Sequence, residues 1–192
     1  KLQLPSTNSA GHTDVAPIEH PLYAGGVGPR GNPVATGLVR DADLILALGT
    51  RLGFNTARFT SEIVTPRSKI VQVDIDPLAI GRYYPVALGI VGDAGTVAGE
   101  LADLMDAVPA AHAPWRARHE KFEKDRREML GAREEIARKG ARPLHPEAIY
   151  SQLRKVAPRH ALLTNDAGTT CPQATARQTF HTAPALNAPL HF

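Results

Sequence analysis

Two stretches decide the fold: Ala42-Asp-Leu-Ile-Leu-Ala-Leu-Gly-Thr-Arg51 and Lys69-Ile-Val-Gln-Val-Asp-Ile-Asp76. Leu44–Leu48 is a continuous apolar run, which predicts a strand buried on both faces of a parallel sheet. The second stretch is rich in β-branched residues and predicts another such strand. Both stretches end in small or polar residues, and open parallel sheets bind ligands beyond the carboxyl ends of their strands. The alternative is that both are ordinary core strands with solvated ends.

Helix and strand signals alternate around these stretches. Asn32-Pro33 predicts the start of a helix that runs to Arg40, because Asn caps helices and Pro suits the first helical position. Phe54–Thr65 is mixed in character and predicts a loop with a short strand or turn. Further predicted elements are a short helix at Leu78–Gly81, a strand at Leu88–Ala94 and a helix at Thr96–Val108. The alternation predicts an α/β fold with a Rossmann-like parallel sheet.

The second half of the chain begins a new unit. Pro109–Pro114 reads as a linker, and Trp115–Lys139 as a highly charged helix that crosses a surface or bridges domains. After it we expect a helix at Pro146–Val156, with Ile149, Leu153 and Val156 buried, a strand at Ala161–Asp166 and a helix at Pro172–Phe180. His181–Phe192 trails off without completing a sheet. The predicted division is therefore a nucleotide-binding-like domain over residues 1–108, a linker with the charged helix over 109–142, and a truncated second α/β domain over 143–192.

Composition excludes several classes of protein. The 192 residues are 43% hydrophobic and 21% charged, as in ordinary globular proteins. The net charge is +3, but the basic residues of the charged helix alternate with acidic ones, which argues against a nucleic-acid-binding stripe. No apolar run approaches the ~20 residues that span a membrane. Cys171 is the single cysteine, so no intrachain disulfide can form, and a reducing cytoplasm is the expected location.

The long N-terminal loop contains polar and glycine-rich segments. The residues His12, Asp14, Glu19 and His20 match no standard metal-ligand spacing, so we expect no metal there. The loop closes with Tyr23-Ala-Gly-Gly-Val-Gly-Pro-Arg-Gly31, whose glycines permit close approach of a ligand and whose Arg30 can meet a phosphate. No strand is expected to lead directly into this segment, so it does not match the dinucleotide-binding fingerprint.

Two further polar groups follow predicted strands. Asp74 can accept hydrogen bonds from ribose hydroxyls, whereas Asp76 is at least as well explained as a helix cap. The turn Gly168-Thr169-Thr170 lies between a predicted strand and a helix N-terminus, where hydroxyls and free N–H groups can cradle a phosphate. It lacks the lysine of a P-loop. Cys171 is interpreted as a small residue beside the cap, because no paired histidine marks it as a nucleophile.

The order of these motifs resembles a known enzyme family. The segments are His20-Pro-Leu, Gly28-Pro-Arg-Gly31, Ala42–Arg51, Val73-Asp-Ile-Asp-Pro77, Ile80-Gly81 and Val91-Gly-Asp93. Together they resemble the central domain of thiamine-diphosphate-dependent enzymes of the acetolactate synthase type. Pro143-Leu-His-Pro146 and Thr164-Asn-Asp-Ala-Gly168 are similar to the start of that family's diphosphate-binding domain. The resemblance covers nearly the whole chain, and it implies that the first strand and helix of the central domain precede this sequence.

The resemblance also implies cofactors and site residues. The intact parent would use thiamine diphosphate and Mg²⁺ to decarboxylate a 2-oxo acid and transfer the acyl unit, as a homodimer or homotetramer. Gly168, Thr169 and Thr170 would contact thiamine diphosphate. FAD or ADP, in members that carry them, would lie along Arg30 and along the residues Gly49, Thr50, Arg51, Asp74, Ile75, Gly92 and Asp93. The activating glutamate and the Mg²⁺-binding motif are not in this sequence, so no catalytic residue or metal ligand is assigned, and the fragment is expected to be inactive alone.

Several alternatives stay open. Thr169-Thr170 stand where acetolactate synthases have Gln-His, and Gly28-Pro-Arg-Gly31 replaces their usual Gly-Met-His-Gly. The motifs are similar also to those of sulfoacetaldehyde acetyltransferase, benzoylformate decarboxylase and oxalyl-CoA decarboxylase. Two readings from other classes are a free-standing FAD- or NAD-binding module of the electron-transfer type and a non-catalytic structural fragment.

Overall fold

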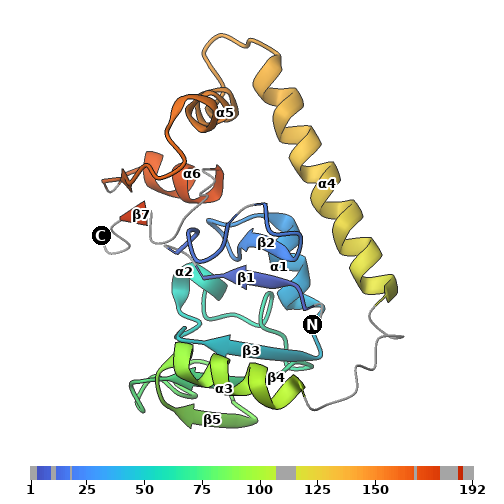
Figure 1. Cartoon of the computed structure of the whole chain (residues 1–192), viewed down its shortest axis with the longest axis vertical. Coiled ribbons are helices and arrows are strands. Elements are labelled where there is room, and N and C mark those ends of the chain that lie inside the picture. The colour runs from blue at the N-terminus through green and yellow to red at the C-terminus, as the bar shows by residue number, and fades with distance from the viewer. Residues whose placement is uncertain are drawn as a thin grey trace.

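A computed structural model describes residues 4–9, 12–17, 19–106, 116–166, 168–177 and 186–187 (Figure 1). Its strands are β1 (Ser6–Asn8), β2 (Tyr23–Gly26), β3 (Leu44–Leu48), β4 (Lys69–Asp74), β5 (Leu88–Val91), β6 (Leu163–Thr164) and β7 (Leu186–Asn187). Its helices are α1 (Pro33–Arg40), α2 (Phe54–Ala57), α3 (Ala94–Asp106), α4 (Arg116–Arg138), α5 (Pro146–Val156) and α6 (Thr170–Arg177). The predicted linker Pro109–Pro114 lies outside the described residues.

The strands form parallel sheets, and the predicted α/β class is confirmed. β3, β4 and β5 pair in that order, with Leu44 opposite Lys69 and Val71 opposite Leu88. β1 pairs with β2, and β6 with β7, each in parallel. The described residues therefore form separate sheets of two, three and two strands, where the sequence predicts one sheet for the first domain.

The capped helices begin where their sequence signals place them. The Asn32 side chain accepts a hydrogen bond from Ala35 N at 2.9 Å and donates one to Ala24 O at 2.8 Å, so it caps α1 and ties the helix to β2. α1 and α5 have the predicted bounds. One weaker signal fails: Leu78–Gly81 forms turns instead of a helix, and Gly81, with φ +70°, ends the segment in a left-handed conformation.

Short elements are also hard to predict, because a few residues cannot carry a periodic hydrophobic pattern. Phe54–Ala57 is a one-turn helix inside a segment predicted as loop with a strand or turn. The strand predicted at Ala161–Asp166 is reduced to β6, and the helix predicted at Pro172–Phe180 begins earlier, at Thr170. His181–Phe192 was expected to trail off without completing a sheet, and its described residues Leu186–Asn187 form the two-residue strand β7, which pairs with β6. The rest of that segment lies outside the described residues.

The glycine-rich segment Tyr23–Gly31 has no strand leading into it, as expected, but its own first four residues form a strand that was not predicted. This strand, β2, leads into Val27–Gly31, and α1 follows. Tyr23 is buried, and its hydroxyl donates to Asn8 Oδ1 at 2.6 Å and lies 2.9 Å from Thr13 O. An aromatic residue ahead of two glycines is a weak strand signal, and the buried tyrosine, not an apolar run, holds this strand in place.

The expected burial of β3 on both faces is also wrong. Ile45 and Ala47 face the core, but the side chains of Leu44, Leu46 and Leu48 are 57%, 40% and 37% exposed. Successive side chains of a strand point to opposite faces, so the three leucines share one face. α3 packs over part of that face and leaves Leu44, Leu46 and Leu48 partly open to solvent.

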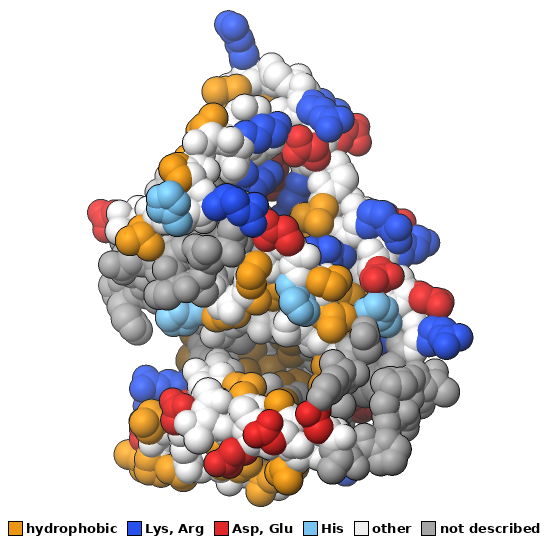
Figure 2. Space-filling model, in the orientation of Figure 1, with side chains coloured by type: hydrophobic (Ala, Val, Ile, Leu, Met, Phe, Trp, Pro, Cys, Tyr) orange, Lys and Arg blue, Asp and Glu red, His pale blue; other side chains and the backbone are white. Residues whose placement is uncertain are grey.

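A single apolar core joins the first two sheets. Its buried residues come from β2, α1, β3, β4, the loops between them and α4: Ala24, Val27, Ala35, Ala47, Leu52, Ala57, Ile63, Val64, Ile70 and Phe122. Phe122 is the buried side chain of the charged helix α4, and the Arg126 Nε–H of the same helix donates to Tyr23 O at 3.0 Å. The helix therefore lies across the surface, as its composition predicts, and Figure 2 shows basic and acidic side chains interspersed along it.

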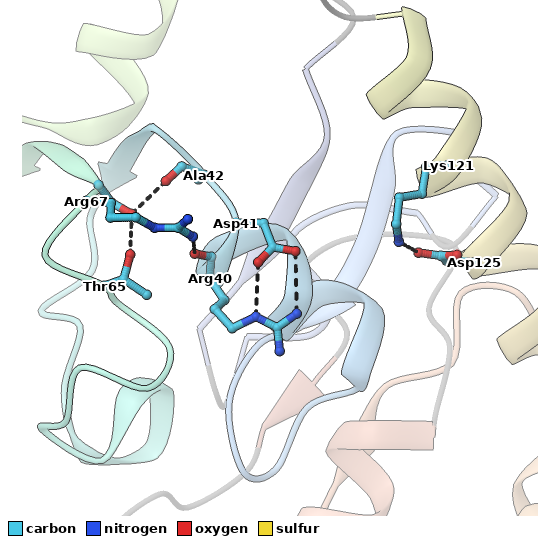
Figure 3. A network of polar contacts seen from close by, with 8 residues as sticks. Arg40, Asp41, Ala42, Thr65, Arg67, Lys121 and Asp125 are labelled. Atoms are coloured by element: carbon cyan, nitrogen blue, oxygen red, sulfur yellow. Dashed lines mark hydrogen bonds and ion pairs between the residues drawn. The ribbon is translucent and has the colours of Figure 1, made fainter.

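The amino ends of β3 and β4 are joined by polar contacts (Figure 3). Arg40 pairs with Asp41 at 3.0 Å, and this hydrogen bond holds the pKa of the Asp41 carboxyl below its usual value. Arg67 Nη2 donates to Arg40 O at 3.3 Å, and Ser68 Oγ donates to Ala42 O at 2.7 Å. Lys121 and Asp125, also drawn there, pair within α4. These contacts fix the edge of the sheet opposite to the one where ligands of such sheets bind.

Charged residues join α4, α5 and α6. The Glu147 carboxylate on α5 is 5% exposed and lies 2.9 Å from Arg177 Nε on α6 and 3.7 Å from Arg133 Nε on α4. Burial lowers the pKa of Arg133, and the Glu147 charge opposes that change. The prediction that Ile149 and Val156 are buried on α5 is wrong: they are 54% and 75% exposed, whereas Glu147 and Ser151 are buried.

Candidate functional site

The carboxyl ends of β3, β4 and β5 bring most of the predicted nucleotide-site residues to one edge. Because the strands are parallel neighbours, the segments that follow them lie at the same edge of the sheet. These segments begin with Gly49–Arg51, Ile75 and Gly92–Asp93, and Asp74 is the last residue of β4. The predicted residues therefore gather at one edge of the sheet. Their own contacts indicate whether each suits ligand binding or is a solvated strand end.

The turn after β3 is held by its own backbone. Gly49 has φ +60°, and its N–H donates to Val73 O at 2.8 Å. Gln72 Nε2 donates to Thr50 O at 3.1 Å, which fixes the next residue. Arg51 is exposed, and within the described ranges no acidic side chain pairs with it. This turn thus presents a cation at the carboxyl edge.

The two aspartates at the end of β4 hold turns. Asp74 is 7% exposed, and its Oδ1 accepts from Asp76 N at 3.0 Å. The Asp74 carbonyl accepts from Gly92 N at 3.1 Å, which links the ends of β4 and β5. Asp76 Oδ1 accepts from Leu78 N at 3.0 Å, so the capping interpretation of Asp76 describes its contact, though the segment it caps is a turn. Ile75, between them, is 76% exposed.

Asp93 is engaged as the cap of α3. Its Oδ1 accepts from Thr96 N at 2.8 Å and from Thr96 Oγ1 at 2.9 Å. These hydrogen bonds hold the pKa of the Asp93 carboxyl below its ordinary value. Gly92 packs close to α3, since a Cβ there would lie 3.4 Å from Val97 Cγ2. The family resemblance assigns Gly92 and Asp93 to a nucleotide site. The contacts show that Asp93 also caps α3.

The glycines of the loop after β2 serve packing within the protein. A Cβ on Gly28 would lie 2.3 Å from Thr56 O, and one on Gly31 would lie 2.0 Å from Gly26 O. Gly28 N donates to Thr36 Oγ1 at 3.2 Å, so the loop is also tied to α1. Arg30 is partly buried in this loop. The close approach that the glycines permit is thus to α2 and β2, and it places the loop beside the segment that follows β3.

Gly168–Thr170 belong to a different sheet. They follow β6 and begin α6, whereas Arg51 and Asp74 follow or end strands of the β3–β4–β5 sheet. All three are exposed; Gly168 has φ +127°, and a Cβ there would meet nothing within 4 Å. Tyr150 Oη donates to Thr170 O at 3.4 Å. Two hydroxyls at an open helix N-terminus fit a diphosphate group.

Cys171 follows this turn and is fully buried. Its N–H donates to Gly168 O at 3.2 Å, within the turn that opens α6. A fully buried thiol has no access to a substrate, since reactive cysteines sit in partly exposed surroundings. The interpretation of Cys171 as a small packing residue agrees with this burial.

One feature near the carboxyl edge was missed from the sequence. The Phe59 ring packs at a tilt against Tyr83, with ring centroids 4.5 Å apart, and against Phe54 at 5.7 Å, and all three side chains are exposed. The Arg82 guanidinium lies 5.5 Å from the Tyr83 ring centroid. Phe54 and Phe59 are close in sequence but Tyr83 is not, so only the fold reveals the group.

Neither a metal cluster nor a membrane-spanning helix is present among the described residues. Within these ranges, no three His, Cys, Asp or Glu side chains gather as metal ligands would. In the same part of the chain, no helix combines the length and the apolar character needed to cross a membrane.

Comparison with known proteins adds a family. Residues 1–101 match the family model described as "Thiamine pyrophosphate enzyme, central domain". The chain is 32% identical over 186 residues to the sulfoacetaldehyde acetyltransferase of Castellaniella defragrans, covering 88% of this chain and 31% of that protein. It is 32% identical over 200 residues to the enzyme of the same name from Roseovarius nubinhibens, covering 93% of this chain and 33% of the relative.

A second group of relatives matches a shorter part of the chain. The probable acetolactate synthase large subunit of Methanocaldococcus jannaschii is 38% identical over 96 residues, which is 49% of this chain and 15% of that protein. The chain spans about a third of the length of the sulfoacetaldehyde acetyltransferases that it matches.

Proposed function

The chain belongs to the thiamine pyrophosphate enzyme family, whose central domain it carries, and on that premise we propose that it is part of a longer enzyme that transfers an acyl unit with thiamine diphosphate. One observation carries the proposal. The sulfoacetaldehyde acetyltransferases align with 88% to 98% of this chain, whereas the acetolactate synthases align with 49% to 58%. The longer alignment extends beyond residue 101, where the central-domain match ends.

Thr169 and Thr170 argue against an acetolactate synthase. Hydroxyl residues stand there in place of the Gln-His of acetolactate synthases, and in this they resemble benzoylformate decarboxylase. In the proposal, the exposed turn Gly168–Thr170 and the first N–H groups of α6 hold one end of the diphosphate, and residues outside this chain supply the Mg²⁺ ligands. When bound, thiamine diphosphate supplies the electron sink that makes the carbon–carbon bond breakable.

The acyl donor is a small carbonyl compound. We propose decarboxylation of a 2-oxo acid as the first half of the reaction, and the name of the sulfoacetaldehyde acetyltransferases that match most of the chain points to sulfoacetaldehyde as the competing donor. The two differ in product: only a 2-oxo acid releases CO₂. Incubating the full-length enzyme with either donor, and measuring CO₂ together with the acylated product, decides between them. Absence of any acylated product from both donors would contradict acyl transfer.

Nucleotide binding by the carboxyl edge is a separate part of the proposal. Arg51 is exposed there and suits a phosphate, while Asp74 and Asp93 already hold turns and α3. FAD or ADP is the proposed ligand, in line with the flavin-containing members that the motifs resemble. A thermal-shift titration of the 192-residue chain with FAD, ADP, NAD and thiamine diphosphate plus Mg²⁺ tests it, because a ligand of the native state raises the melting temperature.

The expected pattern separates the candidate functions. FAD or ADP should stabilise the chain modestly, and thiamine diphosphate should not, because the Mg²⁺ ligands lie elsewhere. A clear Mg²⁺-dependent shift with thiamine diphosphate would contradict this placement. Tight retention of flavin through purification would favour the electron-transfer module instead. The parent enzyme is proposed to be a cytoplasmic homodimer or homotetramer.

A further inference from the structure

Five basic side chains share two carboxylates where α4, α5 and α6 meet, and they form a basic cluster. Glu147 lies between two of them, with Arg177 Nε at 2.9 Å and Arg133 Nε at 3.7 Å. Glu134 lies within 4.0 Å of the other three, which are Arg138, Arg154 and Lys155. All 19 acidic residues of the chain belong to the described ranges, and within these ranges no other carboxylate pairs with any of the five. The basic cluster therefore has five positive charges against two negative ones.

The three arginines at the centre of the basic cluster are largely buried and have few hydrogen-bond acceptors. The side chains of Arg133, Arg154 and Arg177 are 21%, 24% and 26% exposed. A guanidinium group has five N–H donors. Arg154 Nη1 donates to Arg177 O at 3.0 Å, but neither Arg133 nor Arg177 donates a hydrogen bond to a described residue. The buried Oε2 of Glu147 accepts none either, so most of these N–H groups lack an acceptor among the described residues.

The three guanidinium groups also repel one another. Burial lowers the pKa of Arg133, and the charges of Arg177 and Arg154 lower it further, against the effect of Glu147. The arginines come from three different helices, Arg133 from α4, Arg154 from α5 and Arg177 from α6, so the fold itself brings them together. Gathering like charges out of water is unfavourable without a counter-ion, and the chain supplies too few carboxylates to act as one.

The arrangement of the donors selects the shape and charge of a counter-ion. A carboxylate is planar and pairs with one guanidinium group through two parallel hydrogen bonds. A phosphate group is tetrahedral, carries a charge of about −1.5 to −2 at neutral pH as a monoester, and can accept hydrogen bonds from three directions at once. Arg138 and Lys155 flank the basic cluster with side chains that are 78% and 57% exposed, so an anion can approach it from solvent.

We propose that the basic cluster binds a phosphate group, which accepts hydrogen bonds from the N–H groups that Glu134 and Glu147 leave unused. The site is separate from the Gly168–Thr170 turn: α6 begins at Thr170 and ends at Arg177, and a helix rises about 10 Å over that length. A phosphate held there joins α6 to α4 and α5, which lie beside each other in Figure 1. The proposal rests on the charges and contacts of the basic cluster and not on the proposed function.

Thermal denaturation of the 192-residue chain in inorganic phosphate tests the proposal. Phosphate should raise the melting temperature along a saturable curve, because a ligand of the native state stabilises it, whereas sodium chloride at the same ionic strength should not. Glycerol 3-phosphate distinguishes the two sources of the same group. Tighter binding of this ester than of phosphate assigns the site to a phosphorylated organic ligand, and tighter binding of phosphate assigns it to the free ion.

Variants locate the binding, with affinities measured by calorimetric titration. Arg133→Gln should weaken phosphate binding about tenfold or more, because a hydrogen bond to a charged group is lost. Arg127→Gln is the matched control, since Arg127 is an exposed residue of the same helix that pairs with no described residue, and it should bind as the parent chain does. Glu147→Gln should bind phosphate more tightly, because the carboxylate that competes for Arg133 and Arg177 is gone.

Four outcomes overturn the proposal. The first is the same melting temperature in phosphate and in chloride. The second is equal phosphate affinity of Arg133→Gln and Arg127→Gln, with both folds intact by circular dichroism. The third is a Glu147→Gln chain whose α6 stays protected from hydrogen exchange but binds phosphate no more tightly than the parent. The fourth is phosphate binding by the chain that is absent from the full-length enzyme, which assigns the arginines to carboxylates elsewhere in that enzyme. None of these bears on whether the full-length enzyme binds thiamine diphosphate, so the proposed function is tested independently.

Discussion

Gly28 shows that a close backbone approach can be predicted from the sequence although the group that is approached cannot. Its φ of +94° and the nearness of Thr56 O leave no room for a side chain. The sequence indicates that the backbone approaches something closely here, but a glycine does not state what it approaches. The burial of Tyr23 could not be predicted from its neighbours in the sequence. Its hydroxyl contacts Asn8 and Thr13, which lie 15 and 10 residues away.

Replacing Gly28 with alanine should destabilise the chain by about 2 kcal/mol or more, because the new Cβ would lie 2.3 Å from Thr56 O in a left-handed backbone conformation. Gly53→Ala is the matched control: Gly53 has φ −74°, and a Cβ there meets nothing within 4 Å. Urea denaturation measures both variants. Equal stability of the two would show that the contact between this loop and α2 is not as described.

Tyr23 should make the chain sensitive to alkaline pH. Burial raises the pKa of its hydroxyl, and the nearby Asp14 charge raises it further. The folded state then keeps a proton that the unfolded state loses above about pH 10, so stability falls as the pH rises through that value. Tyr23→Phe should lose about 1–2 kcal/mol at pH 7 through its missing hydrogen bonds. Above pH 10 it should show a shallower decline than the parent chain, and an unchanged slope in urea titrations at pH 9 to 11 would contradict this.

At the scale of elements, long or capped segments were predictable and short ones were not. α1 and α5 carry Asn or His at the cap and Pro at the first position, and their bounds agree with the structure. β2 and α2 have four residues each, too few for a periodic pattern. The buried face of α5 was misjudged, because Glu147 is buried by arginines that lie 14 and 30 positions away in the sequence.

Glu147→Gln should loosen α6 from α5. The change leaves Arg133 and Arg177 without the carboxylate between them, and removing one partner of a buried ion pair costs about 3–5 kcal/mol. Hydrogen exchange of α6 and urea denaturation should both report the loss. Glu135→Gln is the control, since Glu135 pairs with Lys139 at the surface and such pairs contribute about 0–1 kcal/mol. Comparable effects of the two variants would argue against a buried ion cluster.

At the scale of the whole molecule, the α/β class follows from the alternation of predicted strands and helices. The division of the strands into separate sheets does not follow from the sequence. The apolar runs of β3 and β4 predict buried parallel strands, yet Leu44, Leu46, Leu48 and Leu88 are 37% to 57% exposed. The runs therefore predict more cover than these strands have among the described residues. Figure 2 shows hydrophobic side chains gathered at the lower end of the view, where β5 and α3 lie.

The two candidate sites also separate at this scale. Gly49–Arg51 and Asp74 belong to the carboxyl edge of the central sheet, while Gly168–Thr170 open a helix of another sheet. A sequence places all of them after strands but does not say which sheet each strand joins. The family explains the separation if the first site holds a nucleotide and the second the diphosphate of thiamine diphosphate, as proposed.

The most direct test of the central claim is calorimetric titration of the full-length enzyme with thiamine diphosphate in the presence of Mg²⁺. Thr170→Val should weaken binding about tenfold or more, because a hydrogen bond to a charged group contributes about 1.5–3 kcal/mol. Thr164→Val, an exposed substitution on β6, should bind as the unmodified enzyme does. An enzyme that does not bind thiamine diphosphate, or one in which Thr170→Val binds as tightly as Thr164→Val, would contradict the account.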